Sequence, residues 1–212
     1  VVDAVVQSAF RSAGQRCSAL RLLCLHEGIA DKVVEMIQGA LQELAVGDPA
    51  ALPTDVVPVI DRDAFDNIQI HLQRLGSTSK VLPALSGRAQ SAPDSTANLV
   101  LPSAFEVASL AGVKDEIFGP VLQIVRWGSG ALKTPEAVIA QINALGYGLT
   151  LGIQTRIDSR AQALAAQAQV EPRVDRLAAI ALVDVPEAHH VVARARRAAE
   201  LELHGLAAPR RL

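Results

Sequence analysis

The chain has 212 residues, half of them hydrophobic and 20% charged, with a formal net charge of -2. A chain of this length can bury a hydrophobic core without disulfide bonds, and its charge gives no basic field to attract nucleic acid. The two cysteines, Cys17 and Cys24, belong to no Cys-x-x-Cys or Cys/His cluster, which argues against a zinc site and a disulfide framework. We expect no metal site, no membrane span and no secretory signal, and a reducing, cytoplasmic setting.

The first part of the chain predicts a helix, a buried strand and a second helix. Residues 2–13 carry apolar side chains at helical spacing, and Gly14 follows as a stop residue. The apolar run 20–26 is typical of a buried strand, and residues 29–46 return to helical spacing. A β–α unit therefore follows the segment that holds Cys17.

The middle of the chain predicts a long loop, one helix and two strands. Residues 46–65 are rich in Pro and Asp, and within them Asp61 is the expected N-cap of a helix over 62–75. Residues 76–98 have no strong period and predict a surface connection with one weak strand. Strand-like runs at 104–110 and 121–127 flank the segment KDEIFGP.

The last regular elements complete an alternating pattern. Thr134 is the expected N-cap of a helix over 135–145, with Pro135 at its first position. A strand over 147–155 and an Ala-rich helix over 158–169 follow. Alternating strands and helices predict an α/β fold with a mostly parallel sheet flanked by helices.

Cys17 is the first candidate for chemistry. A thiolate is nucleophilic near neutral pH, and Arg16 could favour the thiolate form electrostatically. On the residues alone, however, a buried inert cysteine is an equally good interpretation, because free cysteines are often buried. Cys24 lies inside the run Leu22-Leu23-Cys24-Leu25, where apolar surroundings would raise the pKa of a thiol, so we expect it to be a core residue.

Three motifs in order carry a family resemblance: SAGQRCSALR, DEIFGPVLQIVRW and NALGYGLTLGIQT. Together they resemble the catalytic-domain half of the aldehyde dehydrogenase superfamily, over residues 1 to about 170. The runs QRCSALR, TDVVPVID and VRW are similar to L-glutamate γ-semialdehyde (1-pyrroline-5-carboxylate) dehydrogenase, in the version fused to proline dehydrogenase in bacterial bifunctional proline utilisation A flavoproteins. The resemblance implies a truncated aldehyde dehydrogenase catalytic domain.

The resemblance implies a role for four residues. Cys17 would add to the aldehyde and carry a thiohemiacetal and then a thioester, and its backbone N–H would be one oxyanion donor. Ser18 would line the substrate pocket, although a small residue in a turn is an equal alternative. Glu116 and Phe118 would hold the nicotinamide ribose of NAD; without the resemblance they would be a solvated loop acid and a core aromatic residue. The implied reaction is oxidation of L-glutamate γ-semialdehyde to L-glutamate in proline catabolism.

The resemblance also implies that parts of the enzyme lie outside this chain. In the family the cofactor domain, an oxyanion asparagine and the general-base glutamate precede the cysteine motif. We therefore expect a C-terminal catalytic-domain fragment that is inactive alone. Its expected partners are a small-molecule aldehyde and the missing N-terminal half or proline dehydrogenase domain of a homo-oligomeric parent. The alternatives are another aldehyde dehydrogenase, or a non-catalytic remnant that acts as a binding or assembly module.

The end of the chain departs from the family pattern. Residues 171–212 are an Arg- and Ala-rich tail in which Asp184 and Pro186 could start a helix over 186–204. Acidic residues dilute the basic cluster in this stretch, which favours a solvated helix face over a nucleic-acid site. A frameshift, a pseudogene end or a misassembled gene would explain the break, because GC-rich DNA read out of frame gives Arg, Ala, Pro and His.

Overall fold

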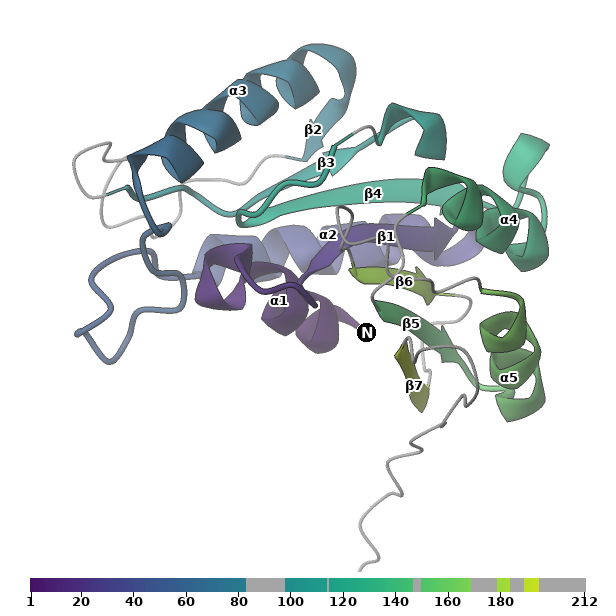
Figure 1. Ribbon diagram of the computed structural model, residues 1–212. Coiled ribbons are helices and arrows are strands. Elements are labelled where there is room, and N and C mark those ends of the chain that lie inside the picture. Colours follow the sequence, from purple (N-terminus) through teal and green to yellow (C-terminus); the bar gives the residue numbers. More distant parts are fainter. Residues whose placement is uncertain (83–97, 114, 147–149, 169–178, 184–188, 195–212) are drawn as a thin grey trace, which may run out of the picture.

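A computed structural model describes residues 1–82, 98–113, 115–146, 150–168, 179–183 and 189–194. In this part of the chain seven strands form a single sheet with helices packed against it (Figure 1). The helices are α1 (Val2–Phe10), α2 (Glu27–Glu43), α3 (Arg62–Thr78), α4 (Pro135–Leu145) and α5 (Asp158–Gln167); the short 3-10 turns are η1 (Arg11–Gly14), η2 (Leu110–Gly112) and η3 (Gly130–Leu132); the strands are β1 (Leu20–His26), β2 (Lys80–Leu82), β3 (Ser103–Glu106), β4 (Val121–Trp127), β5 (Thr150–Thr155), β6 (Ala179–Val183) and β7 (His189–Arg194).

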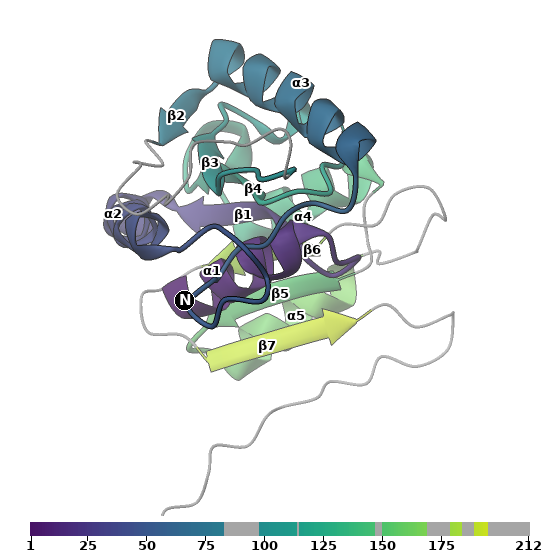
Figure 2. The same ribbon diagram turned by 90° about the vertical axis from the view of Figure 1, so that its left-hand side faces the viewer.

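The sheet is parallel in its centre and antiparallel at both edges. The strand order is β2-β3-β4-β1-β6-β5-β7, in which β3, β4, β1, β6 and β5 run parallel to one another. The edge strands β2 and β7 run antiparallel to β3 and β5, and Figure 2 shows β7 at the end of the sheet away from β2. The predicted mostly parallel α/β fold is confirmed.

The core lies on both faces of the central strands, because parallel strands with helix connections are covered on each side. Helices α1 and α2 pack against each other and both contact β1 and β4, whereas α4 packs on α5 and α5 on β5. Helix α3 contacts β2 near one sheet edge (Figure 1). The buried stripe of α2 follows helical spacing and consists of Ala30, Val33, Val34, Ile37 and Leu41.

Several local predictions are confirmed. Residues 20–26 form β1 with the predicted bounds. The Asp61 carboxylate accepts a hydrogen bond of 2.8 Å from the N–H of Ala64, and the Thr134 hydroxyl accepts one of 3.3 Å from the N–H of Ala137. These contacts satisfy N–H groups that the first turn of a helix leaves without partners, so the capping residues set where α3 and α4 begin.

The first helix is shorter than predicted. Helix α1 ends at Phe10 instead of continuing to residue 13, and the chain enters the turn η1. Ser12, Ala13 and Gly14 all have positive φ, at 55°, 51° and 64°. Positive φ is costly for residues other than glycine, so helical spacing alone cannot predict this turn. Tertiary contacts of the turn, described below, supply the reason.

The predicted helix over 186–204 is wrong where the structure describes it. Residues 189–194 form β7, which pairs antiparallel with β5. Two adjacent β-branched residues, Val191 and Val192, favour a strand, and the outer edge of β5 offers backbone groups that a strand can satisfy. Strand β6 lies between β1 and β5, and the rest of 186–204 lies outside the described residues.

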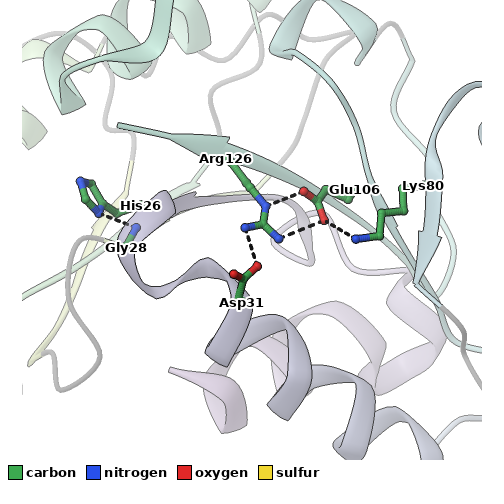
Figure 3. A network of polar contacts seen from close by, with 6 residues as sticks. All are labelled: His26, Gly28, Asp31, Lys80, Glu106 and Arg126. Carbon is green, nitrogen blue, oxygen red and sulfur yellow. Dashed lines mark hydrogen bonds and ion pairs between the residues drawn. The ribbon is translucent and has the colours of Figure 1, made fainter. Parts of the chain in front are cut away.

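An ion-pair network joins four elements at the β2 side of the sheet (Figure 3). The guanidinium of Arg126 on β4 binds the carboxylate of Glu106 on β3 and lies 2.7 Å from Asp31 on α2. Lys80 on β2 lies 3.9 Å from the same Glu106 carboxylate. The hydrogen bond that Arg126 donates to Glu106 is the main cause that raises the pKa of Arg126. The network links the edge of the sheet to α2.

Within the described residues, none of the helices combines the length and the apolar character needed to cross a membrane.

Candidate functional site

The two sequence segments that hold the predicted site residues meet at one end of two central strands. The Cys17 segment leads into β1, and the segment with Glu116 and Phe118 leads into β4. Strands β1 and β4 are parallel neighbours, with Leu22 opposite Gln123. Segments that precede neighbouring parallel strands must arrive at the same end of those strands. Residues about a hundred positions apart in the chain therefore become adjacent.

The two segments are in backbone contact at a pair of glycines. A Cβ on Gly14 would overlap the carbonyl oxygen of Gly119 and lie 2.8 Å from that of Ala9. Gly14 also has a φ of 64°, which glycine adopts without strain. A Cβ on Gly119 would lie 2.7 Å from the side chain of Ile68 on α3. Glycine at both positions therefore allows the two segments and α3 to approach one another.

Arg21, at the start of β1, joins the two segments through its side chain, which is 4% exposed. Its guanidinium donates from Nη1 to the carbonyl of Gly14 and from Nη2 to that of Arg16, the latter at 3.1 Å. Its Nε lies 3.8 Å from Oε1 of Glu116, and its guanidinium carbon lies 4.7 Å from the ring centroid of Phe118. One buried cation thus contacts both predicted motifs.

Burial and the charge of Glu116 shift the pKa of Arg21 in opposite directions. Burial lowers the pKa of Arg21 from 12.5 to about 10, against the raising effects of Glu116 and Cys17. The side chain therefore stays charged at neutral pH, and the Glu116 carboxylate provides a counter-charge. Sequence reasoning did not assign this residue. The available signal was a charged residue second in an otherwise apolar strand, which must find buried polar partners.

Cys17 and Ser18 lie on the surface, in the turn between η1 and β1, and both are exposed. The Arg16 side chain extends toward α1, where its Nη2 donates to the carbonyl of Gln7 at 3.2 Å. Cys24 is fully buried on β1, and burial raises its pKa to about 12. The prediction that Cys24 is a core residue is confirmed.

A cavity of about 630 Å³ lies between α3 and the Glu116–Phe118 segment. Phe118 is 40% exposed, so its ring can meet a bound molecule. Gln15 reaches the cavity from the Cys17 segment, and its side-chain oxygen accepts a hydrogen bond of 2.9 Å from the N–H of Ile60. Cys17 and Ser18 are not part of the wall. The wall includes Gln15, Asp61, Asn67, His71, Glu116 and Phe118.

The cavity wall combines a carboxylate with an exposed aromatic ring. A carboxylate such as Glu116 can accept hydrogen bonds from sugar hydroxyls, and an exposed ring such as that of Phe118 can pack against a flat heterocycle. His71 adds a side chain whose pKa is lowered, first by burial and then by the charge of Arg74. Among the described residues, no group of three or more His, Cys, Asp or Glu side chains is arranged to hold a metal ion.

Comparisons with known proteins agree with the order of the motifs. The model of the "Aldehyde dehydrogenase family" matches residues 1–171. The "Bifunctional protein PutA" of Escherichia coli K12 is 48% identical over 160 residues, which cover 74% of this chain and 12% of that protein. The chain thus spans about an eighth of the length of this relative.

Solved structures give the same result. A crystal structure of a Proline Utilization A (PutA) mutant from Bradyrhizobium japonicum has a TM-score of 0.68 and 36% identity, over 85% of this chain and 17% of that one. Glyceraldehyde-3-phosphate dehydrogenase GapN from Methanocaldococcus jannaschii, solved with NADP, has a TM-score of 0.67 and 25% identity, over 86% of this chain and 36% of that one. The chain belongs to the aldehyde dehydrogenase family, a family of oxidoreductases.

Proposed function

We propose that this chain carries the nucleophile and part of the cofactor site of an NAD-dependent L-glutamate γ-semialdehyde dehydrogenase. The observation that carries the proposal is the junction at Arg21, which contacts the Cys17 segment and both Glu116 and Phe118. Two motifs distant in sequence converge beside one cavity, as a reaction between a bound aldehyde and a bound cofactor requires. The similarity to PutA proteins supports the semialdehyde as substrate.

In the proposed reaction the sulfur of Cys17 attacks the aldehyde carbon. A carbon–sulfur bond forms, and the carbonyl π electrons move to oxygen, where the backbone N–H of Cys17 can stabilise the negative charge. After oxidation, sulfur is a good leaving group when water attacks the thioester. The exposed position of Cys17 leaves its sulfur accessible to a small aldehyde. The sulfur of Cys24 has no such access, because it is fully buried.

Glu116 and Phe118 would hold the nicotinamide ribose. NAD, when bound, supplies the hydride acceptor. The Glu116 carboxylate would accept hydrogen bonds from the ribose, and the Phe118 ring would limit the movement of the nicotinamide. Arg21 keeps both residues beside the Cys17 segment, so a bound aldehyde and the cofactor would be close to each other.

We also propose the setting in which this site works. The family's general base and cofactor domain would come from the missing N-terminal half of the parent, so the isolated chain would not complete turnover. The parent would be a homo-oligomer that also carries a proline dehydrogenase domain. Both cysteines are free thiols, which agrees with a cytoplasmic location.

A chimera tests the proposal. Residues 1–171 would replace the matching segment of the E. coli PutA protein, and NADH formation would be followed with L-glutamate γ-semialdehyde. We expect activity in the chimera and loss of activity in its Cys17→Ala variant, with Cys24→Ala as the matched control that keeps activity. A folded but inactive chimera would contradict the proposal. Higher activity on an unrelated aldehyde would instead indicate another aldehyde dehydrogenase.

A further inference from the structure

The peptide unit between Arg16 and Cys17 is held at its carbonyl by two donors. The oxygen of Arg16 accepts a hydrogen bond of 3.1 Å from Nη2 of Arg21 and one of 3.0 Å from the N–H of Ala19. A carbonyl oxygen has two lone pairs, so both of its acceptor positions are used. The direction of this carbonyl is therefore fixed from inside the protein.

The same peptide unit carries the N–H of Cys17. The described residues contain no cis peptide bond, so the C=O and N–H of this unit point in opposite directions. Because the carbonyl points at the buried Arg21 side chain, the N–H of Cys17 must point away from it. A hydrogen bond from a cation to the carbonyl also polarises the peptide, which makes its N–H a stronger donor.

The turn that precedes this peptide would not keep its shape without such contacts. Ser12 and Ala13 have positive φ, a conformation that costs a non-glycine residue about 1–2 kcal/mol. The other terminal nitrogen of the Arg21 guanidinium, Nη1, donates to the carbonyl of Gly14, at the end of the same turn. Arg21 thus holds the turn on both sides of Gln15, and Glu116 holds Arg21.

From these contacts we infer that Arg21 is a positioning residue for the oxyanion formed at Cys17. It acts through the Arg16–Cys17 peptide: its guanidinium fixes and polarises that peptide, so that the Cys17 N–H is directed at the aldehyde oxygen. Arg21 itself touches neither substrate nor sulfur in this role. The inference rests on the proposed function, in that Cys17 is taken as the residue that adds to the aldehyde.

The reversible first step can be measured in the 212-residue chain without turnover. When an aldehyde adds to Cys17, the carbon–sulfur bond forms, the carbonyl π bond breaks and the thiol proton ends on the former carbonyl oxygen. Adduct formation protects Cys17 from alkylation by iodoacetamide. The probe is succinic semialdehyde, and mass spectrometry of the Cys17 peptide gives both the alkylation rate and the aldehyde concentration that halves it.

The test compares Arg21→Met, Arg21→Lys and the control Arg62→Met. Arg62 is a matched control because it also pairs with an acid, Asp66, and lies 5.1 Å over a ring, that of Phe65, but on an exposed helix surface. We expect Arg21→Met to raise the half-protecting aldehyde concentration at least tenfold beyond any change in the alkylation rate. Arg21→Lys should restore part of the protection, and Arg62→Met should leave it within about twofold of wild type.

The outcomes separate this inference from the proposed function. Wild-type protection that Arg21→Met retains would overturn the role of Arg21. If Cys17 is not protected at all in either the wild-type chain or the chimera with E. coli PutA, Cys17 does not add aldehydes and the proposed function fails. If Arg21→Met does not fold, the nitrogen NMR spectrum of the wild-type chain tests the contacts of Arg21 instead. The hydrogen-bonded Nη groups of Arg21 should give separate, resolved signals. A single averaged signal from freely rotating Nη groups would refute the inference.

Discussion

Gly14 and Gly119 lie in direct backbone contact, although 105 positions separate them in the chain; a Cβ on Gly14 would overlap the carbonyl oxygen of Gly119. The contact joins the turn before β1 to the segment before β4, which are the two segments that hold Cys17 and Glu116. Neither residue carries a side chain, so the shape of the site depends on two positions that have no chemistry of their own.

Alanine at Gly14 should therefore be much more costly than alanine at Gly119. In Gly14→Ala the new Cβ would overlap backbone atoms, and alanine would have to adopt a positive φ. We expect the substitution to lower the free energy of unfolding by about 3 kcal/mol. In Gly119→Ala the nearest atoms to the new Cβ belong to the side chain of Ile68 instead of the backbone, and we expect a loss of about 1 kcal/mol. Urea denaturation of both variants provides the measurement. A loss in Gly14→Ala no larger than that in Gly119→Ala would contradict the close backbone contact at Gly14.

The two cysteines should differ in reactivity in the folded chain. Cys17 is exposed, whereas Cys24 is fully buried and burial raises its pKa to about 12. We expect iodoacetamide to label Cys17 more than about a hundredfold faster than Cys24, since Cys24 reacts only when the chain unfolds. Peptide mass spectrometry distinguishes the two sites, and denaturant should remove the difference. Equal labelling of the native protein would argue against Cys17 as the nucleophile.

Phe118 should affect cofactor binding in the chimera with E. coli PutA. Phe118→Leu removes the exposed ring, and we expect the KM for NAD to rise about tenfold, which corresponds to the loss of one aromatic contact. Steady-state kinetics at saturating aldehyde give this value. Ile70→Val is a suitable control, since Ile70 is exposed on α3 and is not part of the cavity wall. An unchanged KM in Phe118→Leu would remove the ring from the cofactor site.

His71 should make the chain less stable in mild acid. Burial, and then the charge of Arg74, lower the pKa of His71 below its usual 6.5. Near and below that pH the unfolded chain binds the proton more readily than the folded chain, so the free energy of unfolding falls as the pH falls. Urea midpoints at pH about 7.5 and about 5 should show a smaller difference in His71→Gln than in wild type. An identical difference in the two proteins would contradict this account.

The two acids that bind Arg126 should contribute unequally to stability. Asp31 is 89% exposed in its side chain, so Asp31→Asn should change the free energy of unfolding by less than about 0.5 kcal/mol. Glu106 is 17% exposed and also faces Lys80, so Glu106→Gln should cost about 1–2 kcal/mol. Thermal or urea denaturation in low salt measures both. If Asp31→Asn lowered the free energy of unfolding more than Glu106→Gln, solvent exposure would not explain which acid contributes more to stability.

Local structure was largely predictable because its causes lie within a few residues. The apolar run 20–26 predicted β1 with its observed bounds, and Asp61 and Thr134 predicted where α3 and α4 begin. The prediction failed where distant contacts decide. Helix α1 ends at Phe10 because the next residues turn toward Gly119 and Arg21, and residues 189–194 form a strand because β5 offers an edge to pair with.

The candidate site also has one part that local sequence predicts and one part that distant contacts decide. Motifs identified Cys17, Ser18, Glu116 and Phe118 as candidates, because residue type and order carry the family resemblance. They did not identify Arg21, whose partners are two carbonyl groups, one acid and one ring from separate parts of the chain. No local pattern specifies such a set of partners.

The sequence by itself determined the class of fold, the burial of Cys24 and the residue types of the candidate site. Hydrophobic spacing, capping residues and motif order are properties of neighbouring residues, so they can be recognised without coordinates. Only the tertiary structure decided that β1 and β4 are adjacent, and hence that Arg21 binds the Cys17 turn and Glu116 at once. Strand order depends on how the whole sheet buries its two faces, which no short segment of the chain encodes.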